Sequence, residues 1–307
     1  MEPDRKYVIF IVGPTGVGKS TIALRLAEKI GGEIINCDSI QVYKGFDIGT
    51  DKPSAEDRLR IPHHLLDIFD SRTQFTAADF SALAFKAMTA IERQGHLPFV
   101  VGGTGLYIKA LLDGLFPGPG RNEAVRRALD QEAREKGLEA LRHRLEAVDP
   151  AYAKKIGPND RIRIFRALEV YAQTGHPLSE HFLQTQSPLQ DFNAVKIGLQ
   201  LERTELYRRI ETRIDGMFNR GLIQEVETLL AGGVDENSPP FRALGYQSVR
   251  RYLSGRISLE EAVRLTKIDT RHYAKRQITW FRKMAGIQWY SPHDFEDILD
   301  FVKKNLR

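Results

Sequence analysis

A glycine-rich stretch near the N-terminus has the residue types and spacing of a phosphate-binding loop. Its residues match the pattern G-x-x-x-x-G-K-[ST] and are, in order, Gly13, Pro14, Thr15, Gly16, Val17, Gly18, Lys19 and Ser20. In such a loop the glycines let backbone amides turn toward phosphate oxygens, the lysine supplies a cation and the serine hydroxyl can ligate Mg²⁺. An apolar run precedes the stretch and a helical pattern follows it, which is the context that the motif requires. The sequence therefore predicts a P-loop.

Two further polar residues follow apolar runs that read as buried strands. Asp38 comes after residues 33–37, and Thr104 lies in a glycine-rich turn after residues 97–101. The carboxyl ends of parallel strands meet at one edge of a sheet, so we expect both residues near the P-loop. Asp38 is a candidate general base or metal-linked carboxylate, although an aspartate at a strand end more often caps a turn. Thr104 offers a hydroxyl where many kinases have a carboxylate, and a turn without chemical consequence is its alternative.

Cysteine and histidine usage argues against a zinc or disulfide protein. The single cysteine, Cys37, excludes an intramolecular disulfide and a cysteine-rich zinc site, and we expect it to be a core residue. His63 and His64 would point to opposite faces of a strand without a third ligand, so a structural role is expected. The N-terminal apolar run is too short for a secretory signal or a membrane span. We expect a cytoplasmic protein with no membrane partner.

Positive charge gathers in the C-terminal part of the chain. Residues 242–283 contain 11 lysines and arginines against three acidic residues, with five tyrosine, tryptophan and phenylalanine residues interleaved. This pattern is typical of a polyanion-binding surface. A solvated helix face with buried aromatic residues is the alternative.

The order of the predicted elements indicates an α/β fold: a P-loop NTPase-like core with a largely parallel sheet. Strands are expected at 7–12, 33–37, 64–68, 97–101 and 193–201, and helices at 20–30 and 76–94, the latter opened by a Thr76/Asp79 capping box. Two prolines and three glycines at 114–120 break the pattern. We therefore expect a core formed by 1–118 and 192–307, with a helical C-terminal region, and an inserted helical domain at 119–191.

Taken together, these segments resemble the tRNA dimethylallyltransferases, also called tRNA isopentenyltransferases, of the bacterial type. The matching stretches are GPTGVGKS at 13–20, DSIQVYKGFDIGTDKP at 38–53, VGGTGLY at 101–107, DRIRIFRALEVY at 160–171 and RHYAKRQITWFRK at 271–283. They span nearly the whole chain. Asp51 departs from the family pattern, which commonly has a small residue there. The resemblance implies transfer of a dimethylallyl group from dimethylallyl diphosphate to N6 of the tRNA adenosine just 3′ of the anticodon, with Mg²⁺.

The resemblance also implies roles for individual residues. The P-loop and Arg213 would hold the diphosphate, Ser20 would assist Mg²⁺, and Thr104 would contact the bridging oxygen of the leaving pyrophosphate. Asp38 would accept the N6 proton of an adenosine extruded from the anticodon loop. Ser39 and Gln41 would hold the base, and Arg127, Arg161, Arg163 and Arg166 of the inserted domain would meet the anticodon stem-loop. The other expected tRNA contacts are Ile40, Thr104, Lys275 and Arg276.

Two other functions are compatible with a P-loop. A nucleoside or nucleotide kinase would use the inserted domain as an arginine-bearing lid over ATP. A non-enzymatic RNA-binding protein would use the P-loop as a nucleotide-sensing switch. The missing strand-end carboxylate and the basic, aromatic C-terminal stretch favour the transferase over the kinase, and a transfer assay without ATP would separate all three functions. We expect the enzyme to act as a monomer.

Overall fold

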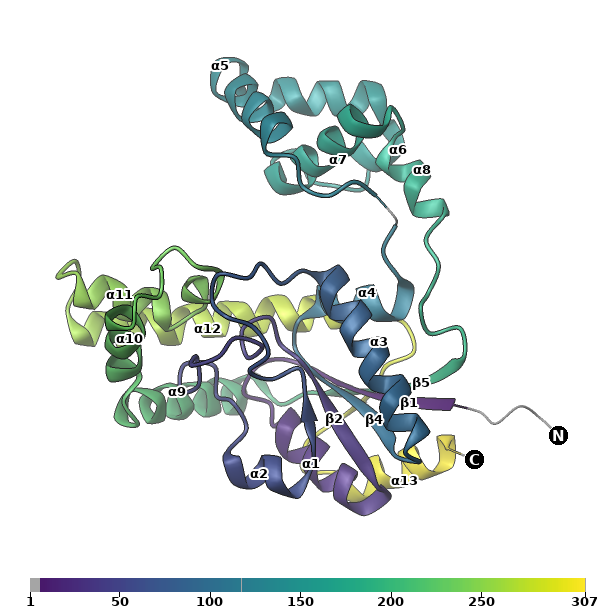
Figure 1. The fold of residues 1–307 in the computed structure, drawn as a ribbon, viewed down its shortest axis with the longest axis vertical. Helices are drawn as coiled ribbons and strands as arrows, with labels where there is room; N and C mark the ends of the chain where they lie inside the picture. The colour runs from purple at the N-terminus through teal and green to yellow at the C-terminus, as the bar shows by residue number, and fades with distance from the viewer. Residues whose placement is uncertain (1–5, 117, 307) are drawn as a thin grey trace. The chain divides into compact units, whose positions relative to one another are not determined.

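The computed structural model describes residues 6–116 and 118–306, which form two compact units. The core unit consists of Met1–Leu112 and Leu189–Arg307, and the inserted unit of Asp113–Pro188. Figure 1 shows the chain leaving the core unit after α4 (Gly105–Asp113) and returning to it at β5 (Phe192–Leu199). Residue 117, within the break predicted at 114–120, lies outside the described residues.

A parallel sheet forms the centre of the core unit. Within the described residues its six strands have the order β3-β2-β4-β1-β5-β6, and every neighbouring pair is parallel. The strands are β1 (Lys6–Val12), β2 (Gly32–Cys37), β3 (His63–His64), β4 (Leu97–Gly102), β5 (Phe192–Leu199) and β6 (Gln288–Tyr290). The α/β fold class expected from the sequence is confirmed.

Helices cover both faces of this sheet (Figure 1). Alternate residues of β1 explain its continuous apolar run: Ile9 and Ile11 belong to one core cluster, whereas Val8, Phe10 and Val12 belong to another. The first cluster takes in side chains of α1 (Lys19–Ile30), α9 (Arg203–Asn219) and α13 (Phe295–Asn305). The second takes in side chains of α3 (Ala77–Arg93) and α4.

A third cluster anchors the loop that follows β2. Val42, Tyr43 and Phe46 of this loop are fully buried against side chains of α9, α10 (Leu222–Ala231) and α11 (Tyr246–Leu253). The Glu225 carboxylate of α10 accepts hydrogen bonds from the amides of residues 47–49 at 2.6–3.2 Å. The loop is therefore held at both its apolar and its backbone groups. The remaining helices of the core unit are α2 (Ala55–Arg60), the 3₁₀ turn Pro239–Arg242 and α12 (Leu259–Phe281).

The inserted unit is entirely helical and has its own core. Its helices are α5 (Glu123–Val148), α6 (Pro150–Ala153), α7 (Arg161–Thr174) and α8 (Leu178–Leu183). Buried leucine, isoleucine, valine and phenylalanine side chains from these helices form a separate cluster. Gly137 has a φ of 81° and kinks α5. The compact unit observed spans 113–188, whereas the sequence placed the domain at 119–191.

Several local expectations need correction. The strand expected at 64–68 is wrong beyond His64, because Leu65 and Asp67 have positive φ angles that end β3. The strand expected to reach residue 201 ends at Leu199, and α4 and β6 were not expected. The Thr76/Asp79 capping box is confirmed. No helix in the described part of the chain is long and apolar enough to cross a bilayer.

Candidate functional site

The predicted P-loop joins β1 to α1, as its motif requires. Gly13, Gly16 and Gly18 have φ angles of 144°, 81° and 100°, which residues other than glycine rarely adopt. A Cβ atom on Gly13 would also lie 2.5 Å from the Leu199 carbonyl oxygen of β5. These glycines therefore let the loop turn tightly over the carboxyl end of the sheet.

The loop borders a cavity of about 290 Å³, here called the P-loop cavity. The cavity is lined by the P-loop, the ends of β2 and β4, the 41–53 loop, α9 and α12. Lys19 is half-buried there, and its Nζ donates a hydrogen bond to the Pro14 carbonyl oxygen at 2.8 Å. Burial, and secondly the neighbouring Arg213, lower the pKa of Lys19 to about 7, although Asp38 opposes the shift. The cavity thus concentrates positive charge that an anionic ligand would stabilise.

Arg213 reaches the P-loop from α9. Its Nη2 donates to Thr15 Oγ1 at 2.7 Å, and its Nη1 lies 3.7 Å from an Asp51 carboxylate oxygen. Asp51 in turn pairs with Arg220 at 3.3 Å. The buried Nε atom of Arg213 has no hydrogen-bond partner in the residues described, and burial lowers the pKa of the guanidinium. An unsatisfied buried donor beside the P-loop is suited to an oxyanion.

Asp38 follows β2 directly and uses one oxygen to hold the turn after the strand. Its Oδ1 accepts from the amides of Ile40 at 2.8 Å and Gln41 at 3.3 Å. The turn-capping alternative considered for this residue is therefore realised. The second oxygen, Oδ2, has no hydrogen bond within the described chain, so capping leaves it available to a ligand. Gln41 donates to the Thr50 carbonyl oxygen at 2.8 Å and ties the turn to the 41–53 loop.

Thr104 lies at the same edge of the sheet, at the start of α4. Its hydroxyl oxygen is buried and lacks a hydrogen-bond partner among residues 6–116 and 118–306. The Tyr273 hydroxyl lies beside it, but the two groups do not meet hydrogen-bond geometry. Thr104 does not line the P-loop cavity itself, whereas its neighbour Gly103 does. Contact between this hydroxyl and a ligand therefore requires the hydroxyl to be uncovered when the ligand binds.

A second cavity, of about 350 Å³, adjoins the P-loop cavity. The two share a wall formed by Thr15, Asp38, Thr50, Arg213 and Tyr273. The rest of the second cavity is lined by Ser39, Ile40, Gly49, Ile214, Met217, Arg242, Ala243, Leu244, Gly245, Thr266, Thr270 and Arg276. The lining thus combines apolar side chains and hydroxyl groups with the guanidinium groups of Arg213, Arg242 and Arg276, and it is more apolar than that of the P-loop cavity. Asp38 and Arg213 thus stand where two ligands of different chemistry could meet.

Sequence reasoning did not assign Gln277, Tyr273 or Asn36 to this site. Gln277 and Tyr273 of α12 line the P-loop cavity, and Asn36 does so from β2 with a buried Nδ2 atom that has no partner in the described residues. Gln277 is only 6% exposed although it lies in a strongly basic stretch. A polar residue at helical spacing from Ala274 and Phe281, both buried, is the signal that could have identified it.

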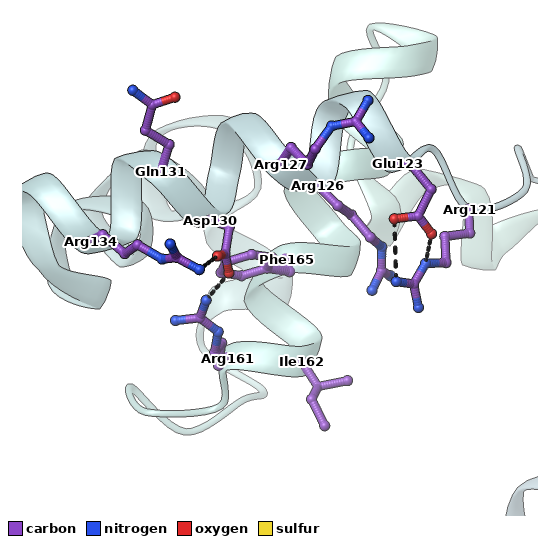
Figure 2. A pocket seen from close by; sticks show the side chains of 10 residues that line it. All are labelled: Arg121, Glu123, Arg126, Arg127, Asp130, Gln131, Arg134, Arg161, Ile162 and Phe165. Carbon is purple, nitrogen blue, oxygen red and sulfur yellow. Dashed lines mark hydrogen bonds and ion pairs between the residues drawn. The ribbon is translucent and has the colours of Figure 1, made fainter. Parts of the chain in front are cut away.

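The expected RNA-contacting arginines of the inserted unit have unequal surroundings. Arg127 and Arg161 line a cavity of about 670 Å³. Figure 2 shows their side chains together with the other lining residues, Arg121, Glu123, Arg126, Asp130, Gln131, Arg134, Ile162 and Phe165. Arg127 is exposed and has no ion pair with any described residue. Arg161 pairs with Asp130, and its guanidinium lies 4.5 Å from the centre of the Phe165 ring. An exposed arginine-rich wall of this kind suits a polyanion.

Arg163 and Arg166 lie outside that cavity. Arg163 pairs with Asp160 at 3.0 Å. Arg166 donates to Glu169 at 3.0 Å and to the Pro119 carbonyl oxygen at 2.8 Å. Burial opposes ionisation of Glu169, but Arg126, the Asn122 amide and Arg166 lower its pKa to about 2. Arg166 therefore stabilises a buried carboxylate inside the unit.

Lys275 and Arg276 occupy the exposed side of α12 in the core unit. Arg276 lines the second cavity and packs over the Tyr273 ring at 5.7 Å, whereas Lys275 lines neither cavity. The structure thus brings the P-loop, Arg213, Asp38, Ser39, Ile40, Gln41 and Arg276 to the two adjoining cavities.

Comparison with known proteins identifies the family. The family model described as IPP transferase matches residues 41–284. A tRNA dimethylallyltransferase of Geobacter metallireducens is 48% identical over 98% of both chains, and tRNA dimethylallyltransferase 2 of Geotalea uraniireducens is 50% identical over 97% of both. The crystal structure of a tRNA isopentenylpyrophosphate transferase from Bacillus halodurans has a TM-score of 0.73 at 40% identity, covering 98% of this chain and 97% of its own. A crystal structure of a eukaryotic dimethylallyltransferase acting on tRNA has a TM-score of 0.79 at 31% identity, covering 97% of this chain and 77% of its own. The chain belongs to the IPP transferase family.

Proposed function

We propose that this protein transfers a dimethylallyl group from dimethylallyl diphosphate to N6 of the tRNA adenosine just 3′ of the anticodon and releases pyrophosphate. The observation that carries the proposal is the shared wall of the two cavities, where Asp38 and Arg213 lie between the P-loop cavity and the less polar second cavity. Family membership and the names of the relatives support the same reaction.

The donor diphosphate occupies the P-loop cavity in this proposal. Amides from Gly16 to Ser20, the Lys19 ammonium and the Arg213 guanidinium surround it, and its charge favours the protonated form of Lys19. Mg²⁺ fits this donor set because the Ser20 hydroxyl at the cavity is an oxygen ligand of the kind that Mg²⁺ prefers. Ser20 would hold such a metal from the protein side, and the metal would supply positive charge next to the leaving group.

The transfer forms a bond between N6 and C1 of the dimethylallyl group and breaks the bond between C1 and the diphosphate oxygen. The proton lost from N6 passes to Asp38 Oδ2, the oxygen that the turn does not use. Arg213, Lys19 and the Thr104 hydroxyl stabilise the negative charge that grows on the pyrophosphate. The adenine lies in the second cavity beside Ser39 and Ile40, with Gln41 holding the 41–53 loop in place.

The RNA itself extends over positively charged surfaces. Arg276 is exposed and lines the second cavity, Lys275 precedes it in the chain and is also exposed, and we propose that both contact the anticodon loop. In the inserted unit, Arg127 is the strongest candidate for a phosphate contact, because its charge is uncompensated within the described residues. Arg161 can stack as well as pair, as it does on Phe165.

A kinase or a nucleotide-sensing switch fits the site less well. A kinase and a nucleotide-sensing switch would each hold a nucleoside triphosphate with Mg²⁺, and kinases commonly supply a carboxylate for the metal. The β4 strand ends instead in Gly102 and Gly103, followed by the buried Thr104 hydroxyl.

The proposed function is tested by a transfer assay without ATP. Purified protein, Mg²⁺, radiolabelled dimethylallyl diphosphate and unmodified tRNA should yield labelled tRNA and pyrophosphate. Digestion of the product to nucleosides should place the label on N6 of one adenosine, and a transcript with guanosine at that position should stay unlabelled. A requirement for ATP, or label that does not reach the RNA, would refute the proposal.

A further inference from the structure

Gln277 of α12 connects the two loops that flank the phosphate site. Its Oε1 accepts a hydrogen bond from the Thr15 amide of the P-loop at 2.8 Å. Its Nε2 donates to the carbonyl oxygen of Gly103, the residue before Thr104, at 2.9 Å. Gln277 is 6% exposed, the hydrogen bond to Gly103 is buried, and the one from Thr15 is partly buried at the edge of the P-loop cavity. One amide group therefore joins the loop after β1 to the loop after β4.

No backbone pairing joins these loops beyond the strand ends in the described chain. The parallel ladder between β1 and β4 ends at the pair Val12 and Gly102. From there one strand leads into the P-loop and the other into the turn that bears Thr104. Gln277 continues the connection one step past the ladder, with the donor and acceptor of a single side chain in place of backbone groups.

Glycines in the β4 loop allow α12 to come this close. A Cβ atom on Gly103 would lie 2.1 Å from Gln277 Nε2, and one on Gly105 would lie 2.4 Å from the Trp280 ring. Tyr273, Gln277 and Trp280 recur at the spacing of one helix face. The turn that bears Thr104 is thus packed directly against that face of α12, and the Gln277 amide sets its position.

We infer that Gln277 is a positioning residue that fixes the Thr104 hydroxyl relative to the diphosphate in the P-loop. The inference rests on the proposed function for the identity of that ligand. Gln277 occupies the Thr15 amide, so the amides left for phosphate begin at Gly16. Diphosphate held by those amides, Lys19 and Arg213 has a fixed place. Gln277 holds the turn that bears Thr104 beside the same cavity, so that the hydroxyl reaches the diphosphate once ligand binding uncovers it. Loss of Gln277 then affects the chemical step more than donor binding.

Gln277→Met tests this because methionine has a similar length and volume but makes neither hydrogen bond. Its single-turnover transfer rate should fall by about 10²-fold, the effect of a displacement of roughly 1 Å at the reacting groups. The dissociation constant for dimethylallyl diphosphate should change by less than about tenfold, because Lys19 and Arg213 are untouched. Gln224→Met, the same substitution at an exposed position of α10, is the matched control and should leave both quantities unchanged.

A double-mutant cycle separates positioning from general loosening of the core. If Gln277 acts through Thr104, then Thr104→Ala should cost much less in the Gln277→Met background than in the wild type. Independent effects that multiply would overturn the inference. Gln277→Glu provides a second background, since it keeps an acceptor for the Thr15 amide but cannot donate to Gly103. It should lower the rate similarly, and full activity of this variant would also overturn the inference.

Hydrogen exchange tests the same connection without substrate. In Gln277→Met, peptides covering residues 13–16 and 102–105 should exchange faster than in the wild type, while peptides from α13 should not change. Unchanged exchange in both loop peptides would refute the connection itself. If the wild type transferred no label but the variant still exchanged faster than the wild type in both loop peptides, the proposed function alone would fail and the connection made by Gln277 would stand.

Discussion

Replacing Asp38 by asparagine separates the two jobs that this side chain can do. The carboxylate uses Oδ1 to hold the amides of Ile40 and Gln41, and leaves Oδ2 without a partner in the described residues. Asparagine keeps an oxygen that can accept from both amides, but places an NH₂ group where Oδ2 stands. Asp38→Asn therefore preserves the turn and removes the proton acceptor.

The expected magnitudes differ for the two jobs. Hydrogen bonds to a charged acceptor contribute about 1.5–3 kcal/mol and neutral ones about 0.5–1.5 kcal/mol, so the turn should weaken by about 1 kcal/mol. A change of that size lowers the melting temperature of a chain this long by only about 2–4 °C. Loss of a general base lowers the chemical rate by at least about 10²-fold, equivalent to about 2.7 kcal/mol of activation free energy. The rate should therefore fall much more than stability.

The assay is single-turnover transfer with saturating dimethylallyl diphosphate and tRNA, run beside thermal melts. Asp38→Ala is the control, because it removes both the turn contacts and the proton acceptor. If Asp38 is the base, both variants lose a similar factor in rate although alanine destabilises the fold more. If the turn alone matters, the asparagine variant keeps a rate within about threefold of the wild type, since asparagine caps nearly as well as aspartate. That last result would refute the base assignment.

Three further predictions follow from the same geometry. Thr104→Ala should lower the single-turnover rate by roughly 10²–10³-fold with tRNA affinity nearly unchanged, and a wild-type rate would exclude a contact with the leaving group. The pKa of Lys19 is lowered to about 7 in the empty site, so most Lys19 side chains are neutral at pH 8, and a bound anion favours the charged form. Calorimetry at pH 8 in buffers of different ionisation enthalpy should therefore detect uptake of about one proton on diphosphate binding, and Lys19→Arg should abolish this uptake. Arg127→Ala should reduce the slope of log tRNA affinity against log salt by about 1 without changing the melting temperature. Arg166→Ala, which removes a partner of buried Glu169, should lower the melting temperature and leave the slope unchanged, and equal slopes in the wild type and both variants would exclude the Arg127 contact.

The sheet was predictable from sequence because its signals are local. The apolar run of β1 and the glycine pattern after it define the strand and the P-loop without reference to other segments. β6 was missed because Gln288–Tyr290 has only three residues, and it forms a strand through pairing with β5. The strand expected at 64–68 failed for a related reason: the positive φ angles of Leu65 and Asp67 depend on tertiary contacts of the 41–53 loop, where Lys52 pairs with Asp67.

The candidate site was predictable only where a motif or a strand end marked it. Asp38 and the P-loop were expected at one edge of the sheet, and the structure places them on one cavity. Gln277 could not be assigned a role, because its partners Thr15 and Gly103 are 262 and 174 residues away in the sequence. Arg166 carried the same charge pattern as Arg161, but only the folded inserted unit distinguishes an arginine over a buried carboxylate from one on an exposed cavity.

The position of β1 in the sheet has a consequence for how the chain folds as it is synthesised. β1 lies between β4, which is made before the inserted unit, and β5, which is made after it. One edge of β1 therefore stays unpaired while the ribosome adds residues 113–188, and an unpaired edge is a template for association with other chains. The inserted unit has its own core and is complete before β5 emerges. The P-loop is the first part of the phosphate site to be translated and α12 the last, so newly made chains acquire a finished site only near the end of synthesis.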